Sequence, residues 1–146
     1  MLTTILLTLI LNLTLTAPEN LRATIPAGRE LSDALTWDNI RAEMLKYGIL
    51  FPDTVMRQVK LESAYLTSRL CLEANNLLGM HYPKKRNTTA TGKVKSNGMA
   101  VYDTWQDCIR DYKLWETYMY KGGDYLDLLS RVYATDPYYL SKLKRL

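Results

Sequence analysis

A chain of 146 residues with an apolar fraction of 47% and a charged fraction of 23% has the size and composition of one ordinary globular domain. It can bury a core of its own, so it needs neither a structural metal nor a dense disulfide framework to fold. The net charge of +4 is mild for a nucleic-acid binder, and no zinc-finger, helix-turn-helix or aromatic RNA-reading signature accompanies it, so we predict no nucleic-acid partner.

The first segment, residues 1–17, reads MLTTILLTLILNLTLTA and is built almost entirely of Leu, Ile and Thr. It resembles the apolar part of a signal peptide, although no Lys or Arg precedes it and Pro18 follows Ala17 directly. A membrane anchor and a helix buried in the fold are the alternatives. A signal or an anchor predicts a secreted, periplasmic or cell-envelope protein. Residues 18–31, with two prolines and mixed polar content, are typical of a linker.

After the linker, apolar residues recur at helical spacing. Thr36 is a suitable N-cap for a first helix, and Gly48 is a suitable stop. A second helix is predicted to begin near Pro52, a residue favoured in the first turn, and to run to about Tyr65. A third covers roughly residues 68–75. The sequence therefore opens its folded domain with three short helices.

The character of the chain changes between His81 and Tyr102, where Lys, Thr, Asn and Gly predominate. Asn97-Gly98, flanked by β-compatible residues, predicts a hairpin closed by a type I′ turn. Helices return over roughly 104–120, 125–132 and from Asp136-Pro137 to the C-terminus. We therefore predict an α+β fold that is mainly helical, with a helical body, a small β-hairpin lobe and a cleft between them.

The basic residues are unevenly placed. Five of them lie close together, at Lys84, Lys85, Arg86, Lys93 and Lys95. No acidic residue occurs over 74–102. Such a run is either a patch that attracts an anionic polymer or a solvated basic loop.

The single histidine, His81, and the two cysteines, Cys71 and Cys108, are too few for a zinc site of the usual composition. We predict no metal and no cofactor. The cysteines either form a disulfide in an oxidising compartment or remain as two partly buried free thiols.

One acidic residue, Glu62, falls on the apolar side of its predicted helix, together with Val55, Val59 and Leu66. Burial there would raise the pKa of the carboxyl group. A carboxylic acid that stays protonated near neutral pH can act as a general acid, as glycoside cleavage requires. The alternative is that Glu62 lies slightly off the apolar face and pairs with a Lys or Arg.

Four stretches, in order, resemble the glucosaminidase domain of glycoside hydrolase family 73, which includes peptidoglycan hydrolases of the flagellar-rod and autolysin types. These stretches are QVKLESAY (58–65), EANNLLGM (73–80), VYDTWQDCIRDY (101–112) and YATDPYYLSKL (133–143). The resemblance covers about residues 36–146. It implies a lysozyme-like fold, a glucosaminidase-like catalytic domain over 32–146, and cleavage of the β-1,4 bond that follows N-acetylglucosamine in peptidoglycan.

The resemblance also implies roles for individual residues. Glu62 matches the catalytic acid, and Tyr133 matches the tyrosine that assists the reacting centre from the opposite side. Asn76 and Gly79 match the segment that shapes the cleft floor. Asp136 and the proline after it are expected to build the turn that aims Tyr133.

The chain departs from the family in two places. Family members often carry a second carboxylate in the β-lobe, and here none is available unless Asp103 reaches the cleft. We therefore expect the 2-acetamido group of the substrate to act as the nucleophile, with Tyr133 steadying the charge. Tyr65 stands where the family often has Trp, so it is expected either on a sugar-facing wall or in the core.

Tyrosine is unusually frequent, with eleven copies, and its amphipathic ring suits a sugar-binding groove. Tyr82 and Tyr102 flank the predicted lobe and are candidates for stacking on sugar rings, with cross-strand packing as the alternative. Trp105 and Trp115 occur at helical positions and are expected in the core.

The leading hypothesis is therefore an endo-β-N-acetylglucosaminidase that acts as a monomer on peptidoglycan glycan strands. A lytic transglycosylase would use the same acid but close the muramic acid ring without water. A non-catalytic peptidoglycan-binding module with the same fold is the alternative from a different class.

Overall fold

The computed structural model describes residues 33–133 and 135–146. The signal-peptide or anchor prediction for residues 1–17 and the linker prediction for 18–31 lie outside the described residues. Within the described ranges, no helix has the length and apolar character needed to cross a bilayer.

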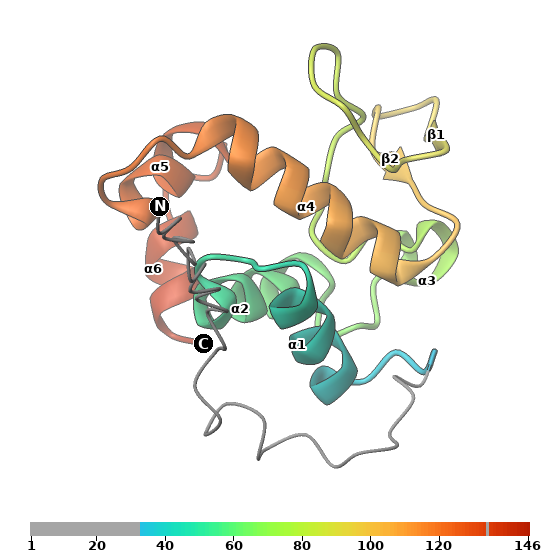
Figure 1. Ribbon diagram of the computed structural model, residues 1–146, viewed down its shortest axis with the longest axis horizontal. Coiled ribbons are helices and arrows are strands. Elements are labelled where there is room, and N and C mark those ends of the chain that lie inside the picture. The colour runs from blue at the N-terminus through green and yellow to red at the C-terminus, as the bar shows by residue number, and fades with distance from the viewer. Residues whose placement is uncertain (1–32, 134) are drawn as a thin grey trace, which may run out of the picture. The chain divides into compact units, whose positions relative to one another are not determined.

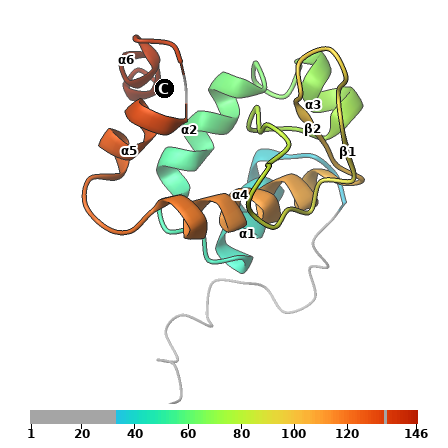
Figure 2. The same cartoon turned by 90° about the horizontal axis from the view of Figure 1, so that it is seen from above.

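The described residues form six helices and one two-stranded sheet, which confirms the predicted α+β, mainly helical fold class. Figures 1 and 2 show α2 near the centre, with α5 and α6 on one side of it and α3 with the hairpin on the other. The elements are α1 (Trp37–Lys46), α2 (Pro52–Glu62), α3 (Arg69–Ala74), β1 (Gly92–Lys93), β2 (Ala100–Val101), α4 (Trp105–Met119), α5 (Tyr125–Val132) and α6 (Tyr139–Lys144).

The capping residues predicted from the sequence explain where most of these helices begin. The Thr36 hydroxyl accepts the Asn39 backbone N–H at 3.2 Å, so it satisfies one of the free donors at the start of α1. Thr104 does the same for α4. Pro52 occupies the first turn of α2, where its missing N–H costs nothing.

The prediction that α2 runs to Tyr65 is wrong by three residues, because the helix ends at Glu62. Ala64, Tyr65 and Leu66 follow with φ values of 48°, 56° and 67°, which a right-handed helix cannot contain. The Ser63 hydroxyl supports this left-handed turn by accepting the Leu66 N–H at 2.8 Å. Glu62 therefore occupies the last helical position, immediately before a sharp change of chain direction.

The predicted hairpin is present, with Gly92 paired to Val101 and Lys93 to Ala100 in antiparallel register. The prediction of a type I′ turn is wrong, because such a turn needs positive φ at both central residues and here only Gly98, at +73°, has it. The chain instead reverses through residues 95–98, closed by hydrogen bonds that join the backbones of Val94 and Met99 and of Gly98 and Val94, each 2.8 Å long.

The Asp136-Pro137 segment forms a turn that precedes the last helix. The prediction that this pair caps and starts the helix is wrong by two residues, since α6 begins at Tyr139. Asp136 accepts the Tyr138 N–H at 2.8 Å, and its carbonyl accepts the Tyr139 N–H at 3.0 Å. The carboxylate thus stabilises the turn that joins Tyr133 to α6.

The β-lobe is fastened to α4 by a buried ion pair. Arg86 donates two hydrogen bonds to Asp111, at 2.6 and 2.9 Å, and the Tyr102 hydroxyl donates to the same carboxylate at 2.8 Å. The side chains of Arg86 and Asp111 are only 7% and 0% exposed. Arg86 therefore does not belong to a solvated basic run, in contrast to the exposed Lys84 and Lys85.

The main core lies among α1, α2, α4 and the segment that follows α3, and it contains Ile40, Met44, Val55, Val59, Leu77, Leu78, Ile109 and Tyr112. Cys71 and Cys108 are both buried in this core, and both are free thiols. Trp105 is also buried there, as predicted, and Trp115 packs against the core while remaining partly buried.

Candidate active site

A pocket of about 300 Å³ opens beside the C-terminal end of α2. One wall comes from α2, another from the segment after α3 together with Met99 of the hairpin loop, and a third from the turn before α6. The pocket therefore lies in the predicted cleft between the helical body and the β-lobe. Its lining residues are Leu61, Glu62, Gly79, His81, Met99, Tyr133, Thr135, Asp136, Tyr139 and Lys142.

Glu62 is the half-buried carboxyl group of this pocket. Burial raises the pKa of Glu62, and an interaction with the Tyr139 hydroxyl partly opposes the rise. The alternative of an ion pair is not what the structure shows, since no Lys or Arg among the described residues pairs with Glu62. A carboxyl group held in this way can retain its proton toward neutral pH and deliver it to a bound molecule.

Gly79 forms the surface directly against this carboxyl group. A Cβ atom at Gly79 would lie 2.9 Å from Oε2 of Glu62, closer than real Cβ contacts allow. The residue also has a φ of +62°, which disfavours any side chain. Gly79 was predicted at the cleft floor. Its backbone lies so close to the Glu62 carboxyl group that only a glycine fits there.

Tyr133 also lines the pocket. Its hydroxyl donates to the Leu78 carbonyl and contacts the Met80 sulfur, so it fastens both neighbours of Gly79. The ring packs edge-on against Trp115, with centroids 5.0 Å apart. Burial keeps the pKa of the Tyr133 phenol well above its usual range, so the group stays protonated.

A second hollow of about 210 Å³ continues from the first, because Gly79, His81 and Tyr133 line both. Tyr82, Trp115 and Val132 extend its lining away from Glu62. The two hollows therefore form one groove that is longer than the Glu62 pocket alone.

Comparison with known protein families identifies the domain. The family model for glucosaminidase, described as mannosyl-glycoprotein endo-β-N-acetylglucosaminidase, matches residues 37–146. The chain belongs to this family. The resemblance found in the four sequence stretches is therefore confirmed, and the domain is placed among glycoside hydrolases.

Solved structures support the lysozyme-like fold of this glucosaminidase domain. It is similar to the catalytic domain of the autolysin Auto from Listeria monocytogenes, with a TM-score of 0.51 and 24% identity over 86% of this chain and 88% of that one. It is also similar to a chain from a type VI secretion system effector–immunity complex of Pseudomonas protegens, with a TM-score of 0.55 and 20% identity over 73% and 84%. No curated protein matches the sequence.

The glucosaminidase domain brings only some of the predicted substrate-binding residues to its groove. Tyr82 is 40% exposed and lines the second hollow. Tyr65 is 58% exposed, but it lies within the left-handed turn and contacts Trp37 rather than lining either hollow. A role in substrate binding remains a prediction for both residues.

Tyr102 and Asn76 lie beneath the groove rather than on its surface. Tyr102 is 2% exposed and donates to Asp111, while the fully buried Asn76 donates to the carbonyls of Met80 and Ala100 at 2.9 Å. Asn76 also accepts the Met80 N–H at 2.9 Å. The Asn76 contacts therefore hold the segment after α3 against the hairpin, and the Tyr102 contact holds the hairpin against α4.

His81 is the site residue that sequence reasoning missed. It lines both hollows and is exposed, and it pairs with Met99 through an isolated antiparallel bridge. From the sequence alone, it is considered only as a zinc ligand. Its position directly after the Asn-Asn-Leu-Leu-Gly-Met stretch is the signal that could have placed it in the cleft.

A second carboxylate does line the Glu62 pocket, but it is not Asp103. Asp103 is exposed and accepts a hydrogen bond from Thr91 at 3.1 Å, away from the lining residues. Asp136 lines the pocket, and its two oxygens are occupied by the Tyr138 N–H and by Lys142, each within 2.8 Å. The hydrogen bond from Lys142 holds the pKa of Asp136 below its usual range.

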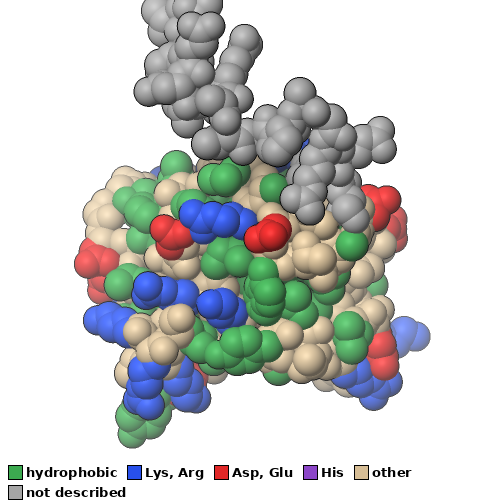
Figure 3. Space-filling view, turned by 90° about the horizontal axis from the view of Figure 1, so that it is seen from below, with side chains coloured by type: hydrophobic (Ala, Val, Ile, Leu, Met, Phe, Trp, Pro, Cys, Tyr) green, Lys and Arg blue, Asp and Glu red, His purple; other side chains and the backbone are tan. Residues whose placement is uncertain are grey.

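Metal-ligating side chains are not clustered in the described part of the glucosaminidase domain, where no group of three or more His, Cys, Asp or Glu could hold a metal ion. Figure 3 shows one face on which several Lys and Arg side chains gather at the lower left, while acidic side chains lie mainly above them and at the right.

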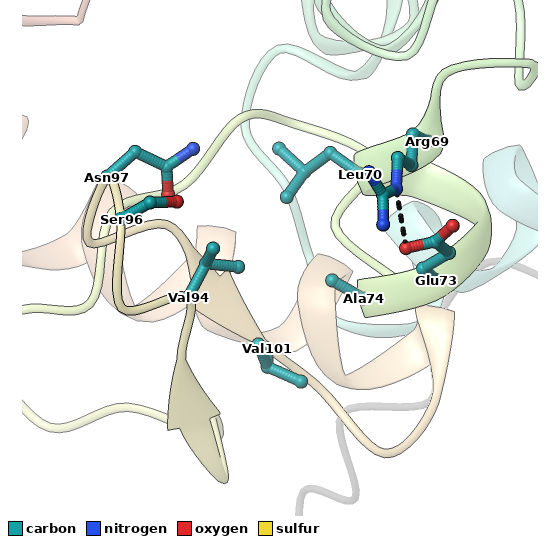
Figure 4. A pocket seen from close by; sticks show the side chains of 8 residues that line it. All are labelled: Arg69, Leu70, Glu73, Ala74, Val94, Ser96, Asn97 and Val101. Atoms are coloured by element: carbon teal, nitrogen blue, oxygen red, sulfur yellow. Dashed lines mark hydrogen bonds and ion pairs between the residues drawn. The ribbon is translucent and has the colours of Figure 1, made fainter.

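A larger hollow, of about 490 Å³, lies between α3 and the hairpin loop (Figure 4). Its walls are mostly apolar, with Leu70, Ala74, Val94 and Val101 around it and Ser96 and Asn97 at the loop. Its charged groups, Arg69 and Glu73, pair with each other at 2.8 Å and are mostly exposed. It presents no desolvated acid, so the chemistry points to the smaller pocket at Glu62.

Proposed function

We propose that this glucosaminidase domain hydrolyses peptidoglycan as an endo-β-N-acetylglucosaminidase, with Glu62 as the general acid. The observation that carries the proposal is the half-buried Glu62 carboxyl, whose pKa burial raises, in a pocket within the matched family domain. Such a substrate implies action at the cell envelope or outside the cell.

The proposed reaction begins with proton transfer from Glu62 to the glycosidic oxygen as the bond from that oxygen to C1 breaks. The carbonyl oxygen of the substrate's 2-acetamido group bonds to C1 and gives an oxazolinium ring. Water then attacks C1 and opens the ring, while the ionised Glu62 accepts the proton of that water. The occupation of both Asp136 oxygens supports this substrate-assisted route over one with a second carboxylate.

Tyr133 is proposed to assist by position. Because its hydroxyl is bonded to the Leu78 carbonyl and stays protonated, its polar tip supports the segment around Gly79 that lies against Glu62. Its ring lines both hollows and is a surface on which a sugar ring can pack. Tyr82 is proposed as a second stacking surface, one sugar further along the groove.

The deciding experiment compares the wild-type chain with Glu62→Gln on purified peptidoglycan, with products analysed by mass spectrometry. We expect N-acetylglucosamine at the new reducing ends for the wild type and a loss of about 10²–10⁴-fold in rate for the variant. Equal rates for the two proteins would refute the role of Glu62.

The same digest separates the other candidate functions. Anhydromuramic acid at the new ends would identify a lytic transglycosylase, which needs the same single acid. A wild-type protein that pellets with cell wall but releases no fragment would identify a binding module. An N-acetylglucosamine-thiazoline inhibitor that leaves hydrolysis unchanged would argue against the acetamido group as nucleophile.

A further inference from the structure

Beneath the pocket, a series of buried polar side chains connects α5 to Glu62. The hydroxyls of Tyr125 and Tyr112 are 2.7 Å apart, and Tyr112 donates to Oε1 of Gln58 at 2.6 Å. Nε2 of Gln58 donates to the Tyr139 hydroxyl at 3.1 Å. The Tyr139 hydroxyl in turn interacts with the Glu62 carboxyl. We call these four side chains, Tyr125, Tyr112, Gln58 and Tyr139, the buried relay.

The direction of the buried relay follows from counting protons. A tyrosine hydroxyl carries one proton, and Tyr112 gives its own to Gln58. The Tyr125 hydroxyl lies 2.7 Å from that of Tyr112 and also interacts with the buried Glu116 carboxylate. The Gln58 amide uses Oε1 as acceptor and Nε2 as donor, which occupies the oxygen of Tyr139 as an acceptor. The Tyr139 proton is then left to point toward Glu62. The donors of Tyr112, Gln58 and Tyr139 therefore face the acid.

The relay is costly to build, since Gln58 and Tyr112 are fully buried. A polar group in the core lowers stability unless all of its partners are present, and apolar side chains of similar shape would pack there without that requirement. The relay also draws one residue from each of four helices, α2, α4, α5 and α6. Gln58 precedes Glu62 by one helical turn, so the two side chains share a face of α2.

We propose that Gln58 and Tyr112 are positioning residues for Glu62, acting through Tyr139, whose donated hydroxyl fixes one oxygen of the carboxyl group. The other oxygen is thereby left to carry the proton toward the glycosidic bond. This proposal rests on the proposed function, because it assumes that Glu62 is the acid. Neither Gln58 nor Tyr112 lines a hollow, so neither can act by touching substrate.

Five other titratable or charged groups face the same pocket, and they determine how a pH profile is read. They are His81, Tyr133, Asp136, Tyr139 and Lys142. Asp136 and Lys142 pair with each other at 2.6 Å, and burial raises the pKa of both tyrosines. His81 is the one histidine among these groups, so the test below includes a background without it.

The test measures kcat/KM against pH on a soluble glycan for the wild type, Tyr112→Phe and Tyr139→Phe. In Tyr112→Phe, Oε1 of Gln58 loses its hydrogen-bond donor. We expect the Gln58 amide to rotate so that Oε1 accepts the Tyr139 hydroxyl, which then no longer donates to Glu62. Because a hydrogen bond to a charged group favours the ionised form, its loss should move the alkaline limb of both profiles upward by about one pH unit. We expect kcat to fall by roughly tenfold as the carboxyl loses its orientation.

Two controls isolate the relay. Ile40→Val loosens the same core without touching the relay, so its profile should keep the wild-type midpoint even though its stability falls. The comparison is repeated in a His81→Gln background, where the shift should persist because Glu62, not His81, causes it. A Tyr112→Phe profile that superimposes on the wild type would overturn the proposal.

A direct titration keeps this inference separate from the proposed function. The ¹³C chemical shift of the Glu62 carboxyl, assigned by its absence in Glu62→Gln, should titrate at higher pH in Tyr112→Phe than in the wild type. An unchanged midpoint would overturn the relay even if Glu62→Gln is inactive. A shifted midpoint in a protein that cleaves no glycan would uphold the relay and refute the hydrolase.

Discussion

Gly79 and Glu62 fit against each other so closely that a Cβ atom on Gly79 would lie 2.9 Å from Oε2 of Glu62. The two residues come from different segments, since Glu62 ends α2 and Gly79 follows α3. Tyr133 fastens both neighbours of Gly79 through Leu78 and Met80. The backbone around Gly79 therefore limits where the carboxyl group can lie.

Gly79→Ala should damage catalysis more than it damages the fold. The new methyl group would push the carboxyl group away from its place, and a displacement of about 1 Å in a catalytic group costs on the order of 10²-fold in rate. The measurement is kcat on peptidoglycan fragments, with the free energy of unfolding from urea titration alongside.

Gly48→Ala is the matched control for this variant. Gly48 has nearly the same φ, +65°, but an added Cβ atom there would meet no atom within 4 Å. The two variants should therefore lose similar stability from backbone strain, while only Gly79→Ala loses activity. Equal losses of activity in both would show that contact with Glu62 is unimportant.

Glu62→Gln should be more stable than the wild type at pH 8. Burial raises the pKa of Glu62 in the folded chain above its unfolded value, so the folded state holds this proton more tightly. Stability is then lost as pH rises from the ordinary glutamate range through the raised value, and the full penalty applies above it. Glutamine has no proton to lose and avoids that penalty.

Urea titrations of Glu62→Gln and the wild type at pH 4 and pH 8 check this prediction. The variant's advantage should be present at pH 8 and largely absent at pH 4, where the wild-type carboxyl is protonated in both states. Glu73→Gln, which changes an exposed glutamate of α3, should show no such gain. An advantage of the same size at both pH values would mean that the gain does not come from the Glu62 charge.

The sequence was sufficient to predict most of the helices and the partial burial of Glu62, because these depend on local patterns. Thr36 and Thr104 are local caps, and the apolar spacing around Glu62 reports its burial directly. The family resemblance then ordered the motifs along the chain. Tyr82 was predicted to face the groove because it is an aromatic residue beside the predicted lobe, and it lines the second hollow.

Other features depended on contacts between segments far apart in the chain. Nothing local to Gln58 indicates that its amide links Tyr112 to Tyr139, since the partners lie 54 and 81 residues away. Tyr102 was predicted to stack on a sugar ring because it lies beside the lobe. Its side chain is instead buried, and its hydroxyl donates to Asp111. The left-handed turn at Ala64, Tyr65 and Leu66 was not predicted either, because none of these residues is a glycine.

Arg86→Met should destabilise the protein strongly, although the residue belongs to a basic run in the sequence. The change would leave the Asp111 carboxylate buried without its cation, and breaking such a pair costs about 3–5 kcal/mol. Urea titration at neutral pH measures the loss. Since the pair joins the β-lobe to α4, activity should fall with the folded fraction.

The control for Arg86→Met is Arg69→Met, which breaks an exposed pair with Glu73. Surface pairs contribute little, so its cost should stay below about 1 kcal/mol. Similar costs for the two variants would show that the Arg86 pair is no better protected from solvent than the Arg69 pair.

The two thiols should be inert in the folded protein and reactive once it unfolds. Cys71 and Cys108 are buried, and burial raises the pKa of both, to about 12 for Cys108. The thiolate is the reactive form, so at pH 8 Cys108 should react about 10³-fold more slowly than an ordinary exposed cysteine. A disulfide-exchange reagent added without reductant should therefore detect almost no thiol in the native chain and two in concentrated urea. Detecting none in urea would instead show that the two sulfurs had been joined, and rapid reaction of the native chain would show that this part of the core opens easily.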